Sequence, residues 1–485
     1  MVLVTIFLVK AAYPALAQDN ITQPQVLVSP LLQAIKDARV VLEEELKKQQ
    51  TEQKKPVVVP SKKVAVPIVL AVWNRDTNAI SLVHAEKKGL TLKIITPGAP
   101  SIKVSFDNGV NSTYRMPKGA QSMVVGTISP IFVETKVKKK IAYTLQDVMY
   151  TPYSQDFFKP EVIAAGSDYL SFLIQDAFDD LRKSNIHSVA FPDRLLVDVI
   201  DPYLIKSIVV IEHADRRLFQ KNEPEHAVGT FLANLALNEE GAFNLSVSSA
   251  GARGLVQFIP STYALLTKRK DLQLISDFTA GMADHRNAIK AQAALLDEDL
   301  ADMPKIIRDL YFQNPAKAGE FLAASYNGGS TRVRRAFTTW GDEGWAISRQ
   351  GELKSLQSKA AVLKSAIVVT KQQITKNKKP KETPLLKKQL VKITREREQA
   401  VNQIAFLQKA SLREETVGYV VKLKKVYAMF TAGFFATPNA PAGALPAPSL
   451  LTLVENTEQV SSPSPSSSSS ESDKVCFSDG GCTAM

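Results

Sequence analysis

A glycine-containing segment at residues 248–262, SSAGARGLVQFIPST, constrains the fold of this chain most strongly. Gly251 and Gly254 come ahead of the amide side chain of Gln257. Because glycine has no Cβ, it lets the backbone come close to another group. We therefore expect a tight loop that brings the backbone against something other than ordinary core side chains.

A second unusual segment, residues 324–329, follows about seventy residues later and reads ASYNGG. It places the phenol of Tyr326 and the amide of Asn327 beside two glycines. Both side chains form directional hydrogen bonds. The two segments together predict a polar site, although Tyr326 could also be a core aromatic residue with a satisfied hydroxyl group.

Residues 151–347 predict a mainly helical domain, because their apolar residues recur at helical spacing. The clearest helical runs are Leu170–Leu181, Pro202–Ile211, Ala227–Leu237 and Ala288–Leu300. The Pro-Ser-Thr turn at the end of the glycine-containing segment predicts a further helix, capped by Ser261 or Thr262.

Residues 61–150 have a different pattern and predict a small β-rich domain. Apolar, β-branched runs at 64–73, 90–95 and 102–106 alternate with turn clusters such as Asp107-Asn108-Gly109. The length lies within the ordinary range for a domain. This region carries no chemical motif, so its sequence predicts no role for it.

The first sixty residues predict export followed by a linker. An apolar run at residues 2–9 precedes Ala15-Leu16-Ala17, a small-x-small cleavage pattern, so we expect residues 1–17 to be a signal peptide. The alternative is a buried N-terminal strand. Residues 18–60 predict a linker that contains one helix, at Leu31–Leu46. No apolar run is long enough to predict a transmembrane segment.

Residues 348–410 predict a basic helical hairpin. Two apolar stripes at 3–4 spacing lie on either side of the turn KKPKETP at residues 378–384. Between residues 348 and 425 there are 19 Lys or Arg against 6 Asp or Glu, which accounts for the whole net charge of +12. Such a basic surface can bind nucleic acid, anionic lipid, an anionic polymer such as that of a cell wall, or peptide carboxylates; the alternative is a solvated charged face. No nucleic-acid motif accompanies it.

The C-terminal residues 431–485 predict a disordered tail, because a Pro/Ala-rich and then Ser-rich composition cannot bury enough apolar surface to fold. The two cysteines of the chain, Cys476 and Cys482, both lie in this tail. In an oxidising compartment they could close a small disulfide loop.

Glu212 is the first candidate for a catalytic acid. Acid catalysis near neutral pH requires a carboxylic acid that stays protonated, and burial against apolar groups raises the pKa enough for that. Glu212 ends the apolar run Leu204–Ile211, which can supply this burial. The alternative is a surface Glu, or an ion pair with Arg216 or Arg217.

The two motifs, their order and their spacing resemble the lytic transglycosylases, enzymes of the lysozyme fold that cleave peptidoglycan. The resemblance covers about residues 195–340 and 411–430, and the hairpin at 348–410 interrupts it. It implies a mainly α, lysozyme-like catalytic domain at 151–347, completed by 411–430. Together with the inserted helical hairpin and the small β-rich N-terminal domain predicted from the sequence patterns, this gives a multidomain chain.

The resemblance also implies a substrate site. In it Ser248 contacts the catalytic carboxyl or the sugar, although a turn or cap Ser is the alternative. Gly251, Gly254 and Gln257 approach the saccharide, and Tyr326 and Asn327 line the site. The stretch LREETVGYV at 412–420 is similar to the family's closing segment, whose tyrosine, here Tyr419, faces the cleft. Arg413 stands where the family usually has Pro, which weakens this last similarity.

Two glutamates compete for the catalytic role. Glu239 is in register with the catalytic Glu of the familiar soluble transglycosylases. Glu212 lies 36 residues before Ser248, a spacing similar to the membrane-bound B type. Glu239 adjoins another acidic residue in a polar context, whereas the segment before Glu212 is more apolar. We therefore expect Glu212 to be the acid and keep Glu239 as the alternative.

The reaction implied is cleavage of the MurNAc–GlcNAc bond of peptidoglycan glycan strands in the periplasm, cell envelope or extracellular space. One Glu would act as acid and base, and the product would be a 1,6-anhydro-MurNAc end. The alternatives are hydrolysis, as in goose-type lysozymes, and a non-catalytic wall-binding or assembly protein. We expect no cofactor and no metal, since the spacings of His213, His226 and His285 match no zinc pattern.

Overall fold

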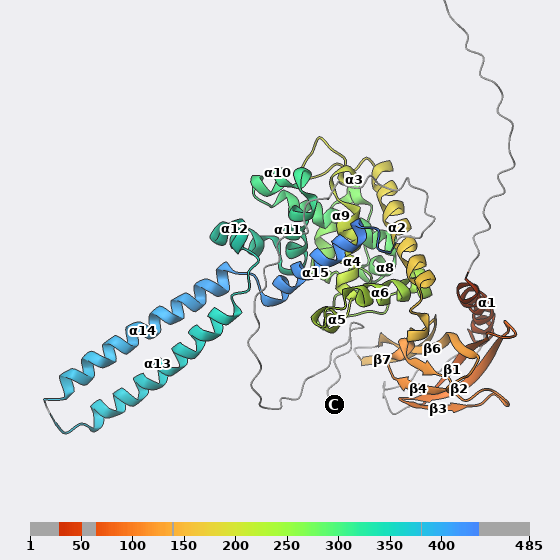
Figure 1. The fold of residues 1–485 in the computed structure, drawn as a ribbon, viewed down its shortest axis with the longest axis horizontal. Helices are drawn as coiled ribbons and strands as arrows, with labels where there is room; N and C mark the ends of the chain where they lie inside the picture. Colours follow the sequence, from red (N-terminus) through yellow and green to blue (C-terminus); the bar gives the residue numbers. More distant parts are fainter. Residues whose placement is uncertain (1–28, 51–64, 138–139, 380, 436–485) are drawn as a thin grey trace, which may run out of the picture.

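The computed structural model describes residues 29–50, 65–137, 140–379 and 381–435. The expected signal peptide, most of the expected tail and both cysteines lie outside the described residues. The described chain is mostly helical, with a small antiparallel sheet in its N-terminal region. Figure 1 shows the sheet at one side of a helical body and a long helical hairpin at the other.

The N-terminal unit is a five-stranded antiparallel sheet of order β3-β2-β1-β6-β7, with a separate β4–β5 ribbon. Its strands are β1 Val66–Asn74, β2 Ile80–Lys88, β3 Thr91–Ile94, β4 Lys103–Phe106, β5 Thr113–Arg115, β6 Ser122–Val137 and β7 Lys140–Tyr150. Strands therefore occur in each of the three runs that the sequence predicts as β-rich.

The central strand β1 is buried on both faces, which explains its nearly continuous apolar sequence. On one face Val69, Ala71 and Trp73 pack with the helix α1, Pro30–Gln50. On the other face lie the residues of the β4–β5 ribbon and β2. The expected helix at Leu31–Leu46 thus exists, but it packs on the sheet, a position that a linker does not imply.

The helical body contains α2 and the helices from α3 to α11, and α15 joins it from beyond the hairpin. The bounds are α2 Pro160–Lys183, α3 Leu196–Val199, α4 Pro202–His213, α5 Arg216–Gln220, α6 Pro224–Asn238, α7 Pro260–Leu266, α8 Phe278–Ala283, α9 His285–Ala301, α10 Lys305–Gln313, α11 Pro315–Gly328, α12 Ser330–Gly344 and α15 Glu414–Thr431. The four runs predicted as helices lie in α2, α4, α6 and α9.

Helix α4 lies at the centre of the body, and α2, α6, α9, α11 and α15 contact it. Its residues from Leu204 to Ile211 are all buried, so the helix is apolar nearly all round. The α2–α6 crossing is close because a Cβ at Gly166 would lie 1.9 Å from the carbonyl oxygen of Leu232. This packing fixes the end of α4, where Glu212 lies.

The chain leaves the body through α12, forms the antiparallel helices α13 Gln350–Lys376 and α14 Thr383–Ala410, and returns as α15. Figure 1 shows the hairpin projecting from the body on the side away from the sheet. Its base is held by α12, since Trp340 donates a hydrogen bond from Nε1 to the carbonyl of Ala410 over 2.9 Å. Arg332 donates to the carbonyls of Gln408 and Ser411. Among the described residues, no helix is both long and apolar enough to cross a membrane.

Candidate active site

Glu212 lies in the last turn of α4, and the start of this helix is set by its sequence. Asp201 is the N-cap and accepts a hydrogen bond from the Tyr203 amide over 2.9 Å, while Pro202 occupies the first turn. The helix ends at His213, whose Nε2 lies 2.9 Å from the carbonyl oxygen of Leu255. Glu212 therefore stands between the buried core and the loop that follows.

Helix α15 supplies the direct partner of Glu212. Tyr419 is buried, and its hydroxyl donates a hydrogen bond to Oε1 of Glu212 over 2.6 Å. One turn further along the same helix, Lys422 donates from Nζ to the carbonyl oxygen of Ile211 over 3.3 Å. The residues that meet at this point are more than 200 positions apart in the sequence.

The protonated form of Glu212 is favoured by its surroundings. Burial raises the pKa of the Glu212 carboxyl to about 7, against the hydrogen bond from Tyr419 and the charge of Lys422, which both lower it. The charge of Glu415 raises this pKa further. A carboxyl with a pKa near neutrality can both give and take a proton, which is what acid–base catalysis requires.

Tyr326, on α11, lies within electrostatic reach of the same carboxyl. Burial raises the pKa of Tyr326 well above its usual value, and the charges of Glu212 and Asp299 add to the effect. The Tyr326 hydroxyl donates to the carbonyl oxygen of Val256 over 2.5 Å. This hydrogen bond ties α11 to the glycine-containing loop.

Asn327 also connects two elements. Its Oδ1 accepts a hydrogen bond from the hydroxyl of Thr416, on α15, over 2.8 Å. The neighbouring Gly328 has no room for a side chain, because an added Cβ would lie 2.8 Å from the same hydroxyl. The second motif therefore fixes how closely α11 and α15 approach each other beside Glu212.

The glycine-containing loop is folded by its own hydrogen bonds. The hydroxyl of Ser248 accepts from the Ala252 amide over 3.0 Å, as expected for a turn serine. Gly251 has φ +78° and open space around it, whereas Gly254 has φ +70° and would place a Cβ 2.2 Å from the Met282 carbonyl oxygen. The close approach at Gly254 is thus to α8, and the hydrogen bonds of Ser248 and Gly251 stay within the loop.

Gln257 has a left-handed backbone, with φ +51°, which is uncommon for a residue with a side chain. Its amide Nε2 lies 3.0 Å from the Gly254 carbonyl oxygen and 3.3 Å from the Ser246 hydroxyl. The helix after the loop, α7, begins at Pro260 with Ile259 as N-cap, and neither Ser261 nor Thr262 caps it. Pro fits this first helical position because it needs no amide donor there.

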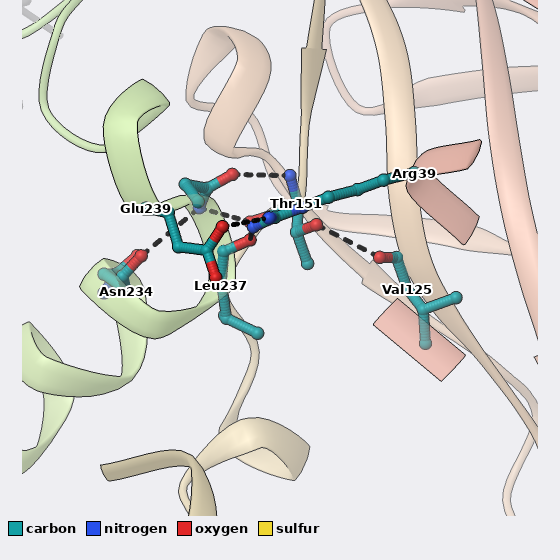
Figure 2. A network of polar contacts seen from close by, with 7 residues as sticks. Arg39, Val125, Thr151, Asn234, Leu237 and Glu239 are labelled. Carbon is teal, nitrogen blue, oxygen red and sulfur yellow. Dashed lines mark hydrogen bonds and ion pairs between the residues drawn. The ribbon is translucent and has the colours of Figure 1, made fainter. Parts of the chain in front are cut away.

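Glu239, the alternative acid, faces a different part of the molecule. It follows α6 and forms an ion pair with Arg39 of α1, with 2.6 Å between Oε2 and Nη1 (Figure 2). Arg39 also donates to the carbonyl of Leu237. The Glu239 side chain is 44% exposed. These contacts join the helical body to the N-terminal unit and include neither Tyr326 nor Tyr419.

Three residues near Glu212 were missed from the sequence: Thr416, Glu415 and Lys422. Thr416 and Glu415 lie inside the closing segment, of which only Tyr419 was predicted to face the cleft. Lys422 follows Tyr419 by three positions, and residues at this spacing share a helix face. The helical spacing of the closing segment was therefore a signal that could have found Lys422.

The described histidines do not gather at one place. His285 lies 2.8 Å from the Ala242 carbonyl through Nε2, and His213 makes its contact with Leu255. In the part of the chain that the structure describes, no group of three or more His, Cys, Asp or Glu side chains is arranged to hold a metal ion.

Two surface hollows lie apart from Glu212. One, of about 380 Å³, lies between the β4–β5 ribbon and β6. The other, of about 900 Å³, is apolar and lies between the start of α2, the start of α6 and Phe434–Phe435. Neither hollow is lined by Glu212, so the candidate site is defined by the chemistry around this carboxyl.

Comparison with known families adds an independent finding. Residues 218–345 match the family described as "Transglycosylase SLT domain". This match supports a likeness of the matched residues to the lytic transglycosylase and lysozyme-like superfamily. The match covers roughly a quarter of the chain, including Glu239, and begins six residues after Glu212. No curated protein and no solved structure matches the chain.

Proposed function

We propose that this protein is a peptidoglycan lytic transglycosylase in which Glu212 acts as both acid and base. The observation that supports the proposal best is the hydrogen bond between Glu212 and Tyr419 at a carboxyl whose pKa is raised to about 7. The match of residues 218–345 to the SLT domain family supports peptidoglycan as the substrate class. The 36-residue spacing from Glu212 to Ser248 agrees with the membrane-bound B arrangement.

In the proposed reaction, protonated Glu212 gives its proton to the glycosidic oxygen between MurNAc and GlcNAc. The bond from that oxygen to the MurNAc anomeric carbon breaks, and GlcNAc leaves with a free hydroxyl group. The acetamido group of the substrate stabilises the positive anomeric carbon. Such proton transfer contributes about 10²–10⁴ in rate.

Glu212, now a carboxylate, takes the proton of the MurNAc 6-hydroxyl group. The freed oxygen bonds to the anomeric carbon and closes the 1,6-anhydro ring, and Glu212 is again protonated. Tyr419 donates to the carboxylate in the intermediate stage, and the Lys422 ammonium lies near enough to stabilise its charge. No water is consumed, so one carboxyl suffices.

Within this proposal the saccharide site is formed by Ser248, Gly251, Gly254, Gln257, Tyr326, Asn327 and Tyr419. Tyr326 and Asn327 hold the loop and α15 in place beside Glu212 through their hydrogen bonds. We further propose that the protein acts after export, in the cell envelope, because its substrate class lies there.

Digestion of purified peptidoglycan, followed by mass spectrometry of the fragments, tests the proposal. We expect 1,6-anhydro ends from the wild-type protein and none from Glu212→Gln, with the fold of the variant intact by circular dichroism. Glu239→Gln is the matched control and should retain activity. An inactive Glu239→Gln beside an active Glu212→Gln would transfer the role to Glu239.

Hydrolysis is a second candidate because one further carboxylate acts on Glu212. The charge of Glu415 raises the Glu212 pKa, and Glu415 is exposed on the first turn of α15. Such a carboxylate could place a water molecule for attack. Reducing ends in place of anhydro ends, lost in Glu415→Gln, would favour hydrolysis of the goose-lysozyme kind.

A further inference from the structure

The outer end of the hairpin, residues 368–379 and 381–395, is a concentrated basic surface that the proposed reaction does not use. We call this stretch the hairpin tip. It carries nine Lys or Arg and one Glu, Glu382, which pairs with Lys379 over 3.1 Å. Its exposed basic residues on α14 are Lys387, Lys388, Lys392 and Arg395. A surface of this charge attracts an anionic partner.

The tip also exposes large apolar side chains among these charges. Val368 and Val369 of α13 are 50% and 51% exposed, and Leu385 and Val391 of α14 are both 69% exposed. The seam between the two helices uses other residues, such as Leu363, Leu386 and Leu390, which are less exposed. At least half of each of these four residues therefore stays exposed to solvent.

The tip is far from the candidate active site. The helices α13 and α14 have 27 and 28 residues, so each spans about 40 Å at 1.5 Å per residue. Figure 1 shows the tip at the far end of the projecting arm. Since charges in solution are screened within about 8 Å at physiological ionic strength, those at the tip act on what the tip touches and not on Glu212.

From these observations we propose that the hairpin tip binds the surface of an anionic lipid bilayer. A bilayer interface offers negative headgroups for the lysines and an apolar layer just below them for the four aliphatic side chains. A hydrated anionic polymer would satisfy the lysines alone. A second hairpin would bring like charges together. This inference goes beyond the proposed function and does not rest on it.

Flotation of the full-length protein with vesicles tests the proposal. The vesicles contain either phosphatidylcholine alone or phosphatidylcholine with phosphatidylglycerol at a 70:30 ratio. We expect binding to the anionic vesicles alone, weakened by added salt. Replacing Lys387, Lys388, Lys392 and Arg395 by Gln should weaken binding on the order of 1,000-fold, because each basic residue near the surface contributes about 1 kcal/mol.

A second variant separates lipid from polymer. Val368→Ser, Val369→Ser, Leu385→Ser and Val391→Ser together remove the aliphatic side chains and leave every charge, and we expect vesicle binding weaker by on the order of 100-fold. The matched control is Phe172→Ser with Ile306→Ser, since these side chains are 63% and 67% exposed on the body. Circular dichroism verifies that the helices persist in each variant.

The outcomes are distinct. Loss of vesicle binding in both tip variants, with the control unchanged, supports the proposal. If the serine variant binds anionic vesicles as tightly as wild type, the lipid proposal is overturned. Retention on isolated cell walls that the glutamine variant alone loses would then identify an anionic wall polymer as the partner. Equal loss of vesicle binding in the control variant would also overturn the proposal, because the binding would then not depend on the hairpin tip in particular.

Discussion

Two opposing influences act on the carboxyl of Glu212. Burial favours the neutral acid, while the Tyr419 hydroxyl and the Lys422 ammonium favour the carboxylate. A residue that must first give and then take a proton needs both forms at accessible free energy. The pKa of about 7 places this balance near neutral pH.

This balance has a consequence for stability. Because the Glu212 pKa rises from 4.5 to about 7 on folding, the folded protein holds more protons between these values than the unfolded chain. Stability therefore falls as pH rises through this window. Glu212→Gln removes the effect, so we expect it to raise the melting temperature at pH 8 and not at pH 4. The gain in the free energy of unfolding at pH 8 is at most about 3 kcal/mol. Equal shifts at both pH values would contradict a raised pKa.

Lys422 offers a second test at the scale of one residue. Its charge lowers the Glu212 pKa, so Lys422→Met should raise that pKa and move the alkaline limb of the pH–rate profile to higher pH. Lys425→Met is the matched control on the same helix, because Lys425 bonds Asn222 over 2.8 Å instead. The groups facing Glu212 are Tyr419, Lys422 and Glu415 from α15 and Tyr326 from α11. An unmoved limb in Lys422→Met would show that its ammonium does not act on the acid.

At the scale of the element, α15 carries two tyrosines with separable tasks. Tyr419 donates to Glu212 over 2.6 Å, and Tyr427 donates to Asp201, the N-cap of α4, over 2.5 Å. A hydrogen bond to a charged group contributes about 1.5–3 kcal/mol, so Tyr419→Phe should slow turnover about 10- to 100-fold. Tyr427→Phe should instead lower thermal stability and leave the rate per folded molecule nearly unchanged. Similar rate losses in both variants would mean that Tyr419 acts only through the packing of α15.

How much of this structure the sequence predicts depends on how far apart the interacting residues lie along the chain. Periodicity located α4 and the β-rich runs, because local burial patterns follow from spacing alone. The apolar residues before Glu212 likewise predicted an apolar environment for its carboxyl, and the residue is half-buried. The partner atoms could not be derived in this way, since Tyr419 reaches Glu212 only after the chain has passed through the whole hairpin. The neighbour of Gly254 could not be derived from spacing either. Its backbone lies close to the Met282 carbonyl because the loop packs against α8 in the folded structure.

At the scale of the whole molecule, the N-terminal unit is attached to the body by more than a chain connection. The side chain of Asn238 exchanges hydrogen bonds with the backbone of Thr151 over 2.8 and 3.0 Å. Apolar residues of α1, such as Leu42, belong to the same buried cluster as Leu237 of α6. The sheet, α1 and α6 therefore share one core, which keeps the β-rich unit fixed on the body.

The ion pair between Arg39 and Glu239 belongs to this junction. Its removal distinguishes a structural role of Glu239 from a catalytic one. We expect Arg39→Ala and Glu239→Gln each to lower the free energy of unfolding by about 0.2–1 kcal/mol, because the pair is partly exposed. The double variant should lose less than the sum of the two, which a double-mutant cycle by denaturant unfolding measures. Glu240→Gln is the neighbouring control.

Peptidoglycan cleavage per folded molecule should stay within about twofold of wild type in all of these variants, since a junction contact adds nothing to the transition state. A large loss of turnover confined to Glu239→Gln, without loss in Arg39→Ala, would instead assign the catalytic proton to Glu239.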